Sequence, residues 1–338
     1  MNLKINFSLA IFLIVVFLTF ELIAAADTLT ILHVNDTHSC LAPLAPRNPD
    51  LSGTQGGIAR AASVIGLTKM TETNVLTLHA GDSFIGDMFF NHYFGAAEFQ
   101  IMNMLGFDAM AVGNHEFDLT PAILDTACHY GLLPSGFPLL SANLILDDPS
   151  VQDLKNFIKP YIIKEFGSLR VGIFGLTTPT ANMISQPAPV FVDTNIGVTA
   201  AITVQELNAQ GCNIVILLSH LGEYYDEMIA AQVPGINLII GGHDHYLYGP
   251  KEVTNPLGQT TWLVQAGSNY SHIGQTKLVL DNGTLSLASY QPIPLDISVP
   301  EEPTVKAAVD GMIAEIEAPT VSHFSHSRLV LQQLILKK

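Results

Sequence analysis

Short, well-separated segments of the sequence carry the residue types that bind metal ions. The first and last segments each hold two such residues two positions apart, and the segments between them add single or adjacent ones. Imidazole, carboxylate and amide donors without a thiolate suit Zn, Mn, Fe or Co, rather than a closed structural zinc site or a calcium loop. The candidates are Asp36, His38, Asp82, Asn114, His115, His220, His243 and His245.

The spacing of these residues indicates how they would hold ions. Asp36 and His38 would point to the same side of an extended backbone and could grip one ion. Asp82 has two carboxylate oxygens and could bridge two ions, whereas the adjacent Asn114 and His115 would point in different directions. The candidates exceed what one tetrahedral ion uses. Two divalent ions would also leave positive charge for a phosphate, because only two ligands are carboxylates. We therefore expect two divalent ions.

Each segment also has an ordinary structural explanation. An Asp-x-His pair is commonly a capped or solvated turn, and a lone His220 could be an ordinary polar residue at the end of a strand. The Gly-Gly-His-Asp-His segment at residues 241–245 is more specific. The occurrence of all the segments together, in this order, favours a metal site.

Predicted strands place these residues at one edge of a sheet. In a layered α/β fold, ligands bind beyond the carboxyl ends of the strands, and each candidate segment follows a predicted strand. Residues 260–290 have the pattern of antiparallel strands, with a turn at 281–283. The other predicted strands are 28–34, 75–80, 109–112, 170–176, 214–219 and 238–240, and the predicted helices are 58–70, 96–105, 123–130 and 194–210.

Composition narrows the classes of function. The chain has 30 acidic residues against 14 basic ones, a formal net charge of −16. Nucleic-acid binding is not expected, because recognition of its backbone needs a basic footprint. An acidic protein that binds phosphate needs a local source of positive charge, which metal ions supply. The three cysteines are too few for a disulfide framework, and their spacing predicts no pairing.

The N-terminus has the pattern of a secretory signal peptide. Lys4 precedes an apolar stretch at residues 5–20, and alanines at 24–26 offer a small-residue cleavage point. We expect removal of residues 1–26, a secreted or periplasmic location, and no membrane attachment afterwards. The alternative is an uncleaved membrane anchor, because the apolar stretch approaches spanning length.

The motifs together resemble the calcineurin-like metallophosphoesterase signature. Ile-Leu-His-Val-Asn-Asp-Thr-His at 31–38, Gly-Asn-His-Glu-Phe-Asp at 113–118 and the Gly-Gly-His-x-His ending resemble the secreted 5′-nucleotidase family more closely. Members of that family include periplasmic UDP-sugar hydrolases and 2′,3′-cyclic phosphodiesterases. The resemblance implies a four-layer α/β/β/α metallophosphoesterase domain with mixed parallel and antiparallel sheets, which we place at residues 27–298.

The resemblance also implies roles for the candidate residues. Water activated at two metal ions, Zn or Mn, would attack phosphorus in line. His115 would donate a hydrogen bond to the phosphoryl oxygens, and Asp118 would orient that imidazole. The alternative for Asp118 is a helix N-cap. Glu116 and Asp244 are expected to point away from the ions. One ion would be held by Asp36, His38, Asp82 and His245, and the second by Asp82, Asn114, His220 and His243.

The last part of the chain departs from the family pattern. The 5′-nucleotidases continue into a second domain that recognises the substrate, whereas residues 299–338 here offer a linker-like helix and an unassigned tail. We expect hydrolysis of small phosphate esters, nucleotides among them. The alternatives are a 2′,3′-cyclic phosphodiesterase, or a non-catalytic secreted remnant that lacks the substrate-binding domain. The sequence leaves open the true substrate, the metal used in vivo and the oligomeric state.

Overall fold

The computed structural model describes residues 27–44, 53–132 and 136–318. Two large sheets run through them, with the strand orders β15-β14-β1-β2-β3-β4-β6 and β12-β13-β11-β10-β8-β7. The first sheet contains β1 (Asp27–Val34), β2 (Val75–His79), β3 (Ala109–Ala111), β4 (Leu139–Leu140), β6 (Ile158–Lys159), β14 (His272–Asp281) and β15 (Thr284–Pro294). The second contains β7 (Tyr161–Phe166), β8 (Leu169–Thr177), β10 (Ile214–His220), β11 (Leu238–Gly241), β12 (Leu247–Thr254) and β13 (Thr260–Ala266).

Both sheets mix parallel and antiparallel pairs. β1 is parallel to β2 and antiparallel to β14, while β10 is parallel to β11 and to β8. β14 and β15 form a hairpin through Asn282 and Gly283, which both have positive φ, as the turn predicted at 281–283 requires. The predicted mixture of strand directions is confirmed.

Alternating side chains of the central strands bury both faces of each sheet. In β1, Ile31 belongs to the apolar core between the two sheets, and its neighbour Leu32 belongs to the core beneath the first helix layer. In β10, Leu218 points into the core between the sheets and Leu217 into the core beneath the second helix layer. A strand buried on both faces must be apolar at successive positions, which explains the continuous apolar runs.

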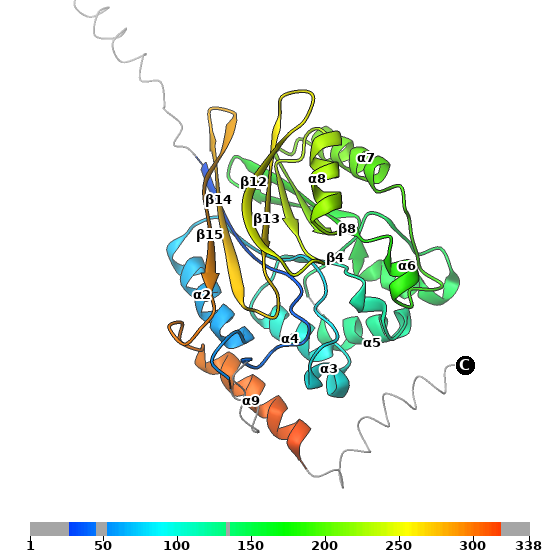
Figure 1. Ribbon diagram of the computed structural model, residues 1–338, viewed down its shortest axis with the longest axis vertical. Coiled ribbons are helices and arrows are strands. Elements are labelled where there is room, and N and C mark those ends of the chain that lie inside the picture. Colours follow the sequence, from blue (N-terminus) through cyan, green and yellow to red (C-terminus); the bar gives the residue numbers. More distant parts are fainter. Residues whose placement is uncertain (1–26, 45–52, 133–135, 319–338) are drawn as a thin grey trace, which may run out of the picture.

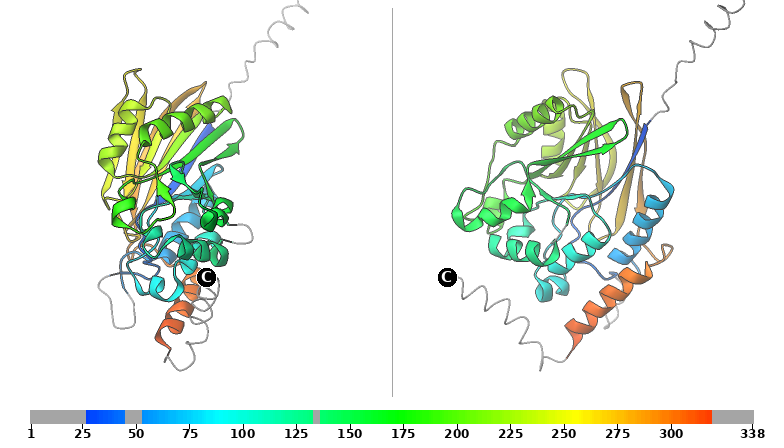
Figure 2. Two further views of the ribbon diagram at one scale, coloured as in Figure 1. Left: turned by 90° about the vertical axis from the view of Figure 1, so that its right-hand side faces the viewer. Right: turned by 180° about the vertical axis from the view of Figure 1, so that it is seen from behind.

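Helices cover the outer faces of the sheets and complete four layers. One layer covers the first sheet, and the other covers the second, as Figure 1 shows with α7 and α8 on one side and α2 and α9 on the other. The turned views in Figure 2 show the same order of layers. The helices are α2 (Ile58–Thr71), α3 (Met88–Tyr93), α4 (Ala96–Met104), α5 (Pro121–Gly131) and α9 (Pro303–Glu317) in the first layer, and α7 (Ile196–Ala209) and α8 (Glu223–Gln232) in the second. The predicted α/β/β/α fold is confirmed.

Several smaller elements were not predicted. These include α3, α8, β7, β12, α6 (Ala181–Ile184) and a two-stranded sheet of β5 (Leu144–Ile145) and β9 (Phe191–Val192). Within the described ranges, no helix is long and apolar enough to cross a membrane. The predicted signal peptide at 1–26 and the end of the predicted tail, residues 319–338, lie outside the described residues, whereas the linker-like helix predicted within 299–338 corresponds to α9.

Candidate metal centre

The candidate residues meet where the parallel strands of both sheets end. Loops after β1, β2 and β3 carry the first of them, β10 contributes its last residue, and the loop after β11 carries the remainder. The first two loops are joined directly, since the amides of Asp36 and His38 donate to the carbonyls of Gly81 and Asp82 at 2.9 and 3.1 Å. Residues far apart in the sequence therefore form one cluster.

The loop after β1 does not have the extended backbone that we predicted. Asp36 and His38 both have φ of 48°, and Asp82 in the neighbouring loop has φ of 58°. Such left-handed backbone costs on the order of 1–3 kcal/mol per residue and persists where surrounding contacts determine it. Here the bonds between the two loops are those contacts. Asp36 and His38 still meet, but through this turned conformation.

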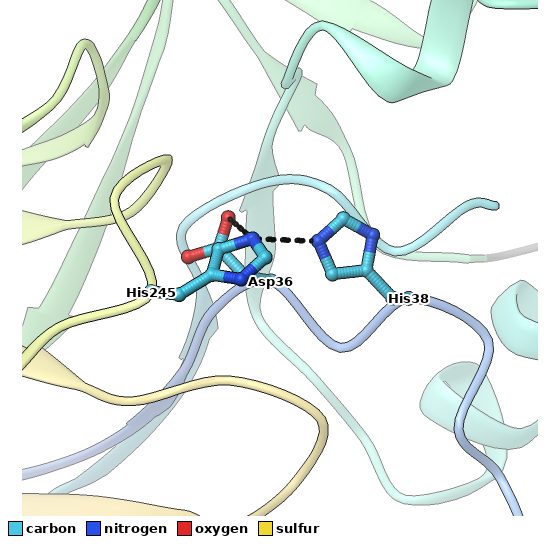
Figure 3. A group of neighbouring side chains, drawn as sticks. All are labelled: Asp36, His38 and His245. Atoms are coloured by element: carbon cyan, nitrogen blue, oxygen red, sulfur yellow. Dashed lines mark hydrogen bonds and ion pairs between the residues drawn. The ribbon is translucent and has the colours of Figure 1, made fainter. Parts of the chain in front are cut away.

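Asp36, His38 and His245 form one group of three ligand atoms, here called the outer group. His38 Nδ1 lies 3.0 Å from the carbonyl oxygen of Ile85, an arrangement that places the proton on Nδ1 and leaves a lone pair on Nε2. That Nε2 lies 2.9 Å from His245 Nε2, and the two imidazoles are turned towards each other beside Asp36 in Figure 3. Two facing nitrogens at this distance need a cation or a proton between them.

Asp82, His220 and His243 form a second group, here called the inner group. His220 Nδ1 donates to the carbonyl of Ala80 at 2.8 Å, which again leaves Nε2 as the donor atom for an ion. That atom is buried, lies 2.9 Å from Asp82 Oδ2, and makes no aligned hydrogen bond. His220 Nε2 is also 4.0 Å from Asp36 Oδ1, so the two groups adjoin.

Asn114 supplies a further sign of a cation site. Its side-chain oxygen is buried and has no hydrogen-bond partner among the described residues. A buried amide oxygen is rarely left unsatisfied, because the lost hydration costs free energy. The donor set of imidazole nitrogens, carboxylates and an amide oxygen fits divalent transition metals.

The two buried carboxylates shape the charge of the cluster. Burial works against protonation of His220, yet Asp82 and Asp36 outweigh it and raise the pKa of this imidazole. Burial alone would raise the pKa of Asp82, but the charge of His220 prevails and holds it below its usual range. Burial raises the pKa of Asp36, against the opposing charge of His220. The cluster thus attracts positive charge, which a divalent ion can supply in place of a proton.

His115 and Asp118 lie beside the two groups. His115 Nδ1 is 2.6 Å from Asp118 Oδ2, and its Nε2 is 3.9 Å from Asp82 Oδ2. Burial opposes the charged imidazole, but the nearby carboxylates, Asp82 foremost, raise the pKa of His115. The N-cap of α5 is Thr120, without a side-chain cap bond, so the alternative that placed Asp118 at the cap is wrong.

Sequence reasoning missed the contacts that hold the loops. His79 lies between Thr37 Oγ1 at 2.9 Å and the Gly81 amide at 3.1 Å, and so joins both ligand loops. Glu116 accepts hydrogen bonds from the loop after β2, and Asp244 accepts from the amide of Glu223. Both carboxylates therefore accept hydrogen bonds from backbone amides.

Comparison with known proteins identifies the family. A family model for calcineurin-like phosphoesterases matches residues 29–247. The chain belongs to the calcineurin-like phosphoesterase family. A snake venom 5′-nucleotidase from Naja atra is 34% identical over 307 residues, which cover 86% of this chain and 57% of that protein. The 5′-nucleotidase of Homo sapiens is 32% identical over 306 residues, which cover 85% of this chain and 53% of that protein.

Solved structures of this phosphoesterase family share the fold. The 5′-nucleotidase precursor from Thermus thermophilus has a TM-score of 0.77 at 34% identity, and the match covers 86% of this chain and 59% of that one. The resemblance to 5′-nucleotidases drawn from the motifs is therefore confirmed. The chain spans little more than half the length of these relatives. The matched part includes the phosphoesterase region at residues 29–247.

Proposed function

We propose that this phosphoesterase domain binds two divalent metal ions and hydrolyses phosphate esters. The observation that carries the proposal is the pair of adjoining three-ligand groups at the strand ends. The buried, unpartnered Asn114 oxygen beside them supports it. The proposed ligands are Asp36, His38, Asp82 and His245 for one ion, and Asp82, Asn114, His220 and His243 for the other.

The chemistry of the bound ions would be that of a Lewis acid. Divalent ions such as Zn or Mn stabilise the charge that develops on phosphoryl oxygens and generate a nucleophile at neutral pH. The chain's own contribution is to hold the imidazole donors in the correct tautomer, as the carbonyls of Ala80 and Ile85 do for His220 and His38. It also keeps the site partly closed to water, because His220 is fully buried.

We assign His115 the role of a hydrogen-bond donor to the phosphoryl group. Its imidazole is about one third exposed and is not needed as a ligand, so Nε2 is free to meet a substrate. Asp118 accepts a hydrogen bond from Nδ1–H and stabilises the charged form of the ring. A charged imidazole offers an N–H at Nε2 where negative charge grows during the reaction.

The proposed substrates are nucleotide phosphate esters. The support is that the relatives from Naja atra, Homo sapiens and Thermus thermophilus carry the name 5′-nucleotidase. A relative in Bacillus subtilis, 32% identical over 320 residues, is named a trifunctional nucleotide phosphoesterase. The resemblance of the motifs to a family that includes 2′,3′-cyclic phosphodiesterases makes a cyclic nucleotide the second substrate class to test.

We further propose that residues 1–26 act as an export signal and that residues 27–298 form the phosphoesterase domain. The support for export is the apolar pattern at 5–20 followed by the alanines at 24–26. N-terminal sequencing of the mature protein tests the cleavage point. A mature chain that begins at Asp27 agrees with the proposal, and retention of residue 1 contradicts it.

The experiment that tests the function starts from metal-free protein. We expect no hydrolysis of p-nitrophenyl phosphate, AMP or 2′,3′-cyclic AMP until Zn²⁺ or Mn²⁺ is added. Release of phosphate from AMP supports a nucleotidase, and turnover of the cyclic ester alone supports the phosphodiesterase. Two bound ions per chain without turnover of any ester would contradict catalysis and favour a non-catalytic remnant.

A further inference from the structure

Glu116 is a fully buried carboxylate that receives an unusual number of hydrogen bonds. Its Oε1 accepts from the Ser83 amide, the Ser83 hydroxyl and the Phe84 amide at 2.7, 3.1 and 3.2 Å. Its Oε2 accepts from the amides of Asp82 and Gly113 at 3.0 and 2.7 Å. Both oxygens are therefore saturated by donors, and Glu116 has no lone pair directed at an ion.

The donors come mainly from the loop that carries Asp82. Three successive amides, those of residues 82–84, converge on this carboxylate, although Glu116 belongs to the loop after a different strand. Asp82 has left-handed backbone, which is strained for a residue other than glycine. Hydrogen bonds to a charged acceptor are stronger than those between neutral groups, and together they offset this strain.

A reverse hydrogen bond closes the connection between the loops. The His115 amide donates to Asp82 Oδ1 at 2.9 Å, while the Asp82 amide donates to Glu116. The loops also approach closely at Gly113, where an added Cβ would lie 2.2 Å from Asp82 Oδ1. The loop that carries Asp82 is thus tied to the loop that carries Asn114 and His115 by a carboxylate whose oxygens are both occupied by amides.

We infer that Glu116 is a positioning residue that places Asp82 relative to Asn114 and His115 and thereby sets the affinity of the metal centre. The inference rests on the proposed function, because Asp82 and Asn114 are its proposed ligands. Loss of a residue that orients a ligand commonly weakens metal binding by about 10- to 100-fold. Glu116 acts through Asp82 and does not contact the ions.

The test compares two Glu→Gln substitutions at buried sites. In Glu116→Gln, the side-chain NH₂ group would face backbone N–H groups from which the carboxylate now accepts hydrogen bonds. Those N–H groups would lose their acceptor, so the loop on that side must move away. Glu98 in α4 is also buried, at 2% exposure, and does not contact these amides, so Glu98→Gln is the matched control. We expect Mn²⁺ affinity, measured by calorimetry, to fall about 10- to 100-fold in Glu116→Gln and to stay at the wild-type value in Glu98→Gln.

A second measurement uses metal-free protein and needs no turnover. Amide hydrogen exchange at residues 82–84 should accelerate in Glu116→Gln, while exchange in β10 stays slow. Unchanged affinity and unchanged exchange would overturn the inference, as would equal losses in both variants, which would indicate general destabilisation. If Glu116→Gln does not fold, Glu116→Asp retains the charge on a shorter side chain, and wild-type Mn²⁺ affinity in that variant would overturn the inference.

These readouts separate the inference from the proposed function. Wild-type protein that binds Mn²⁺ but hydrolyses no ester would contradict the function and leave the affinity comparison intact. Wild-type turnover with no difference between the two Gln variants would contradict the positioning role alone.

Discussion

The outer and inner groups use the same donor types but differ in their exposure to solvent. In the inner group, the side chains of His220 and Asp82 are 0% and 2% exposed. In the outer group, Asp36 is buried, but the His245 side chain is 45% exposed. A buried site holds its ligands in place before an ion arrives, whereas an exposed ligand can leave the ion and turn to water. The two ions would therefore not be held equally.

The largest effect is expected from removing the buried imidazole of the inner group. His220→Ala should abolish binding of the inner ion and essentially all turnover, because His220 Nε2 is buried and faces Asp82 Oδ2 at 2.9 Å within the inner group. Metal content per chain and the rate of AMP hydrolysis measure both effects. The control is His129→Ala, which removes a histidine from the exposed face of α5. Two ions bound to His220→Ala would contradict the assignment of the inner group.

For His115→Ala we expect a large loss of catalysis, while the outer and inner groups each keep their ion. Turnover should fall by about 10²- to 10⁴-fold, the usual contribution of a positioned proton donor. Both ions should remain, because neither group uses this imidazole. Steady-state kinetics and metal analysis on the same sample test this. Loss of an ion in this variant would indicate that His115 is a metal ligand and would contradict its assignment to substrate contact.

The exposure difference itself is tested by the rate at which ions leave. We expect a chelator to remove the outer ion roughly tenfold faster than the inner one, because solvent access controls ligand exchange. Stopped-flow measurements with a coloured chelator on the Mn²⁺ or Zn²⁺ form should show two phases. His245→Ala should lose the fast phase and retain the slow one. A single phase in the wild-type protein would remove the distinction between the groups.

The smallest effect concerns Glu98, the buried acid in α4, and changes stability rather than activity. Burial raises the pKa of Glu98 to about 7 from its ordinary 4.5. Because the folded-state pKa is the higher one, this group's stabilising contribution is complete below pH 4.5 and is lost as the pH rises towards 7. Glu98→Gln should therefore be more stable than wild type at pH 8, by roughly 1–3 kcal/mol.

Thermal unfolding of both metal-free proteins between pH 5 and 8 measures this difference. The gap in Tm should shrink as the pH falls from 8 towards 5. A gap that is constant across this range would show that Glu98 does not take up its proton within it.

The sequence was sufficient for the fold and for the approximate location of the site. Apolar runs such as 214–219 predict strands buried on both faces, and the polar residue after each run predicts a shared edge, because the ends of parallel strands meet there. The motif at 113–118 also indicated the protein family. α8 and β12 were missed, and β12 alternates between exposed and partly buried positions that offer no strong apolar signal.

The loop conformations could not be predicted from local sequence. The left-handed backbone at Asp36 and His38 depends on hydrogen bonds to Gly81 and Asp82, which are distant in the chain. The same holds for Glu116, whose donors lie in the loop after β2. Spacing predicted that Asp36 and His38 lie near an ion, and the packed loops show which contacts set their backbone conformation.

The most direct test of the two-ion centre is a titration of metal-free protein with Mn²⁺, with bound ions and AMP hydrolysis measured at every step. We expect two ions to bind per chain and turnover to appear only as the second ion binds. Full activity with one ion per chain, or the absence of any tight Mn²⁺ binding, would contradict the two-ion centre.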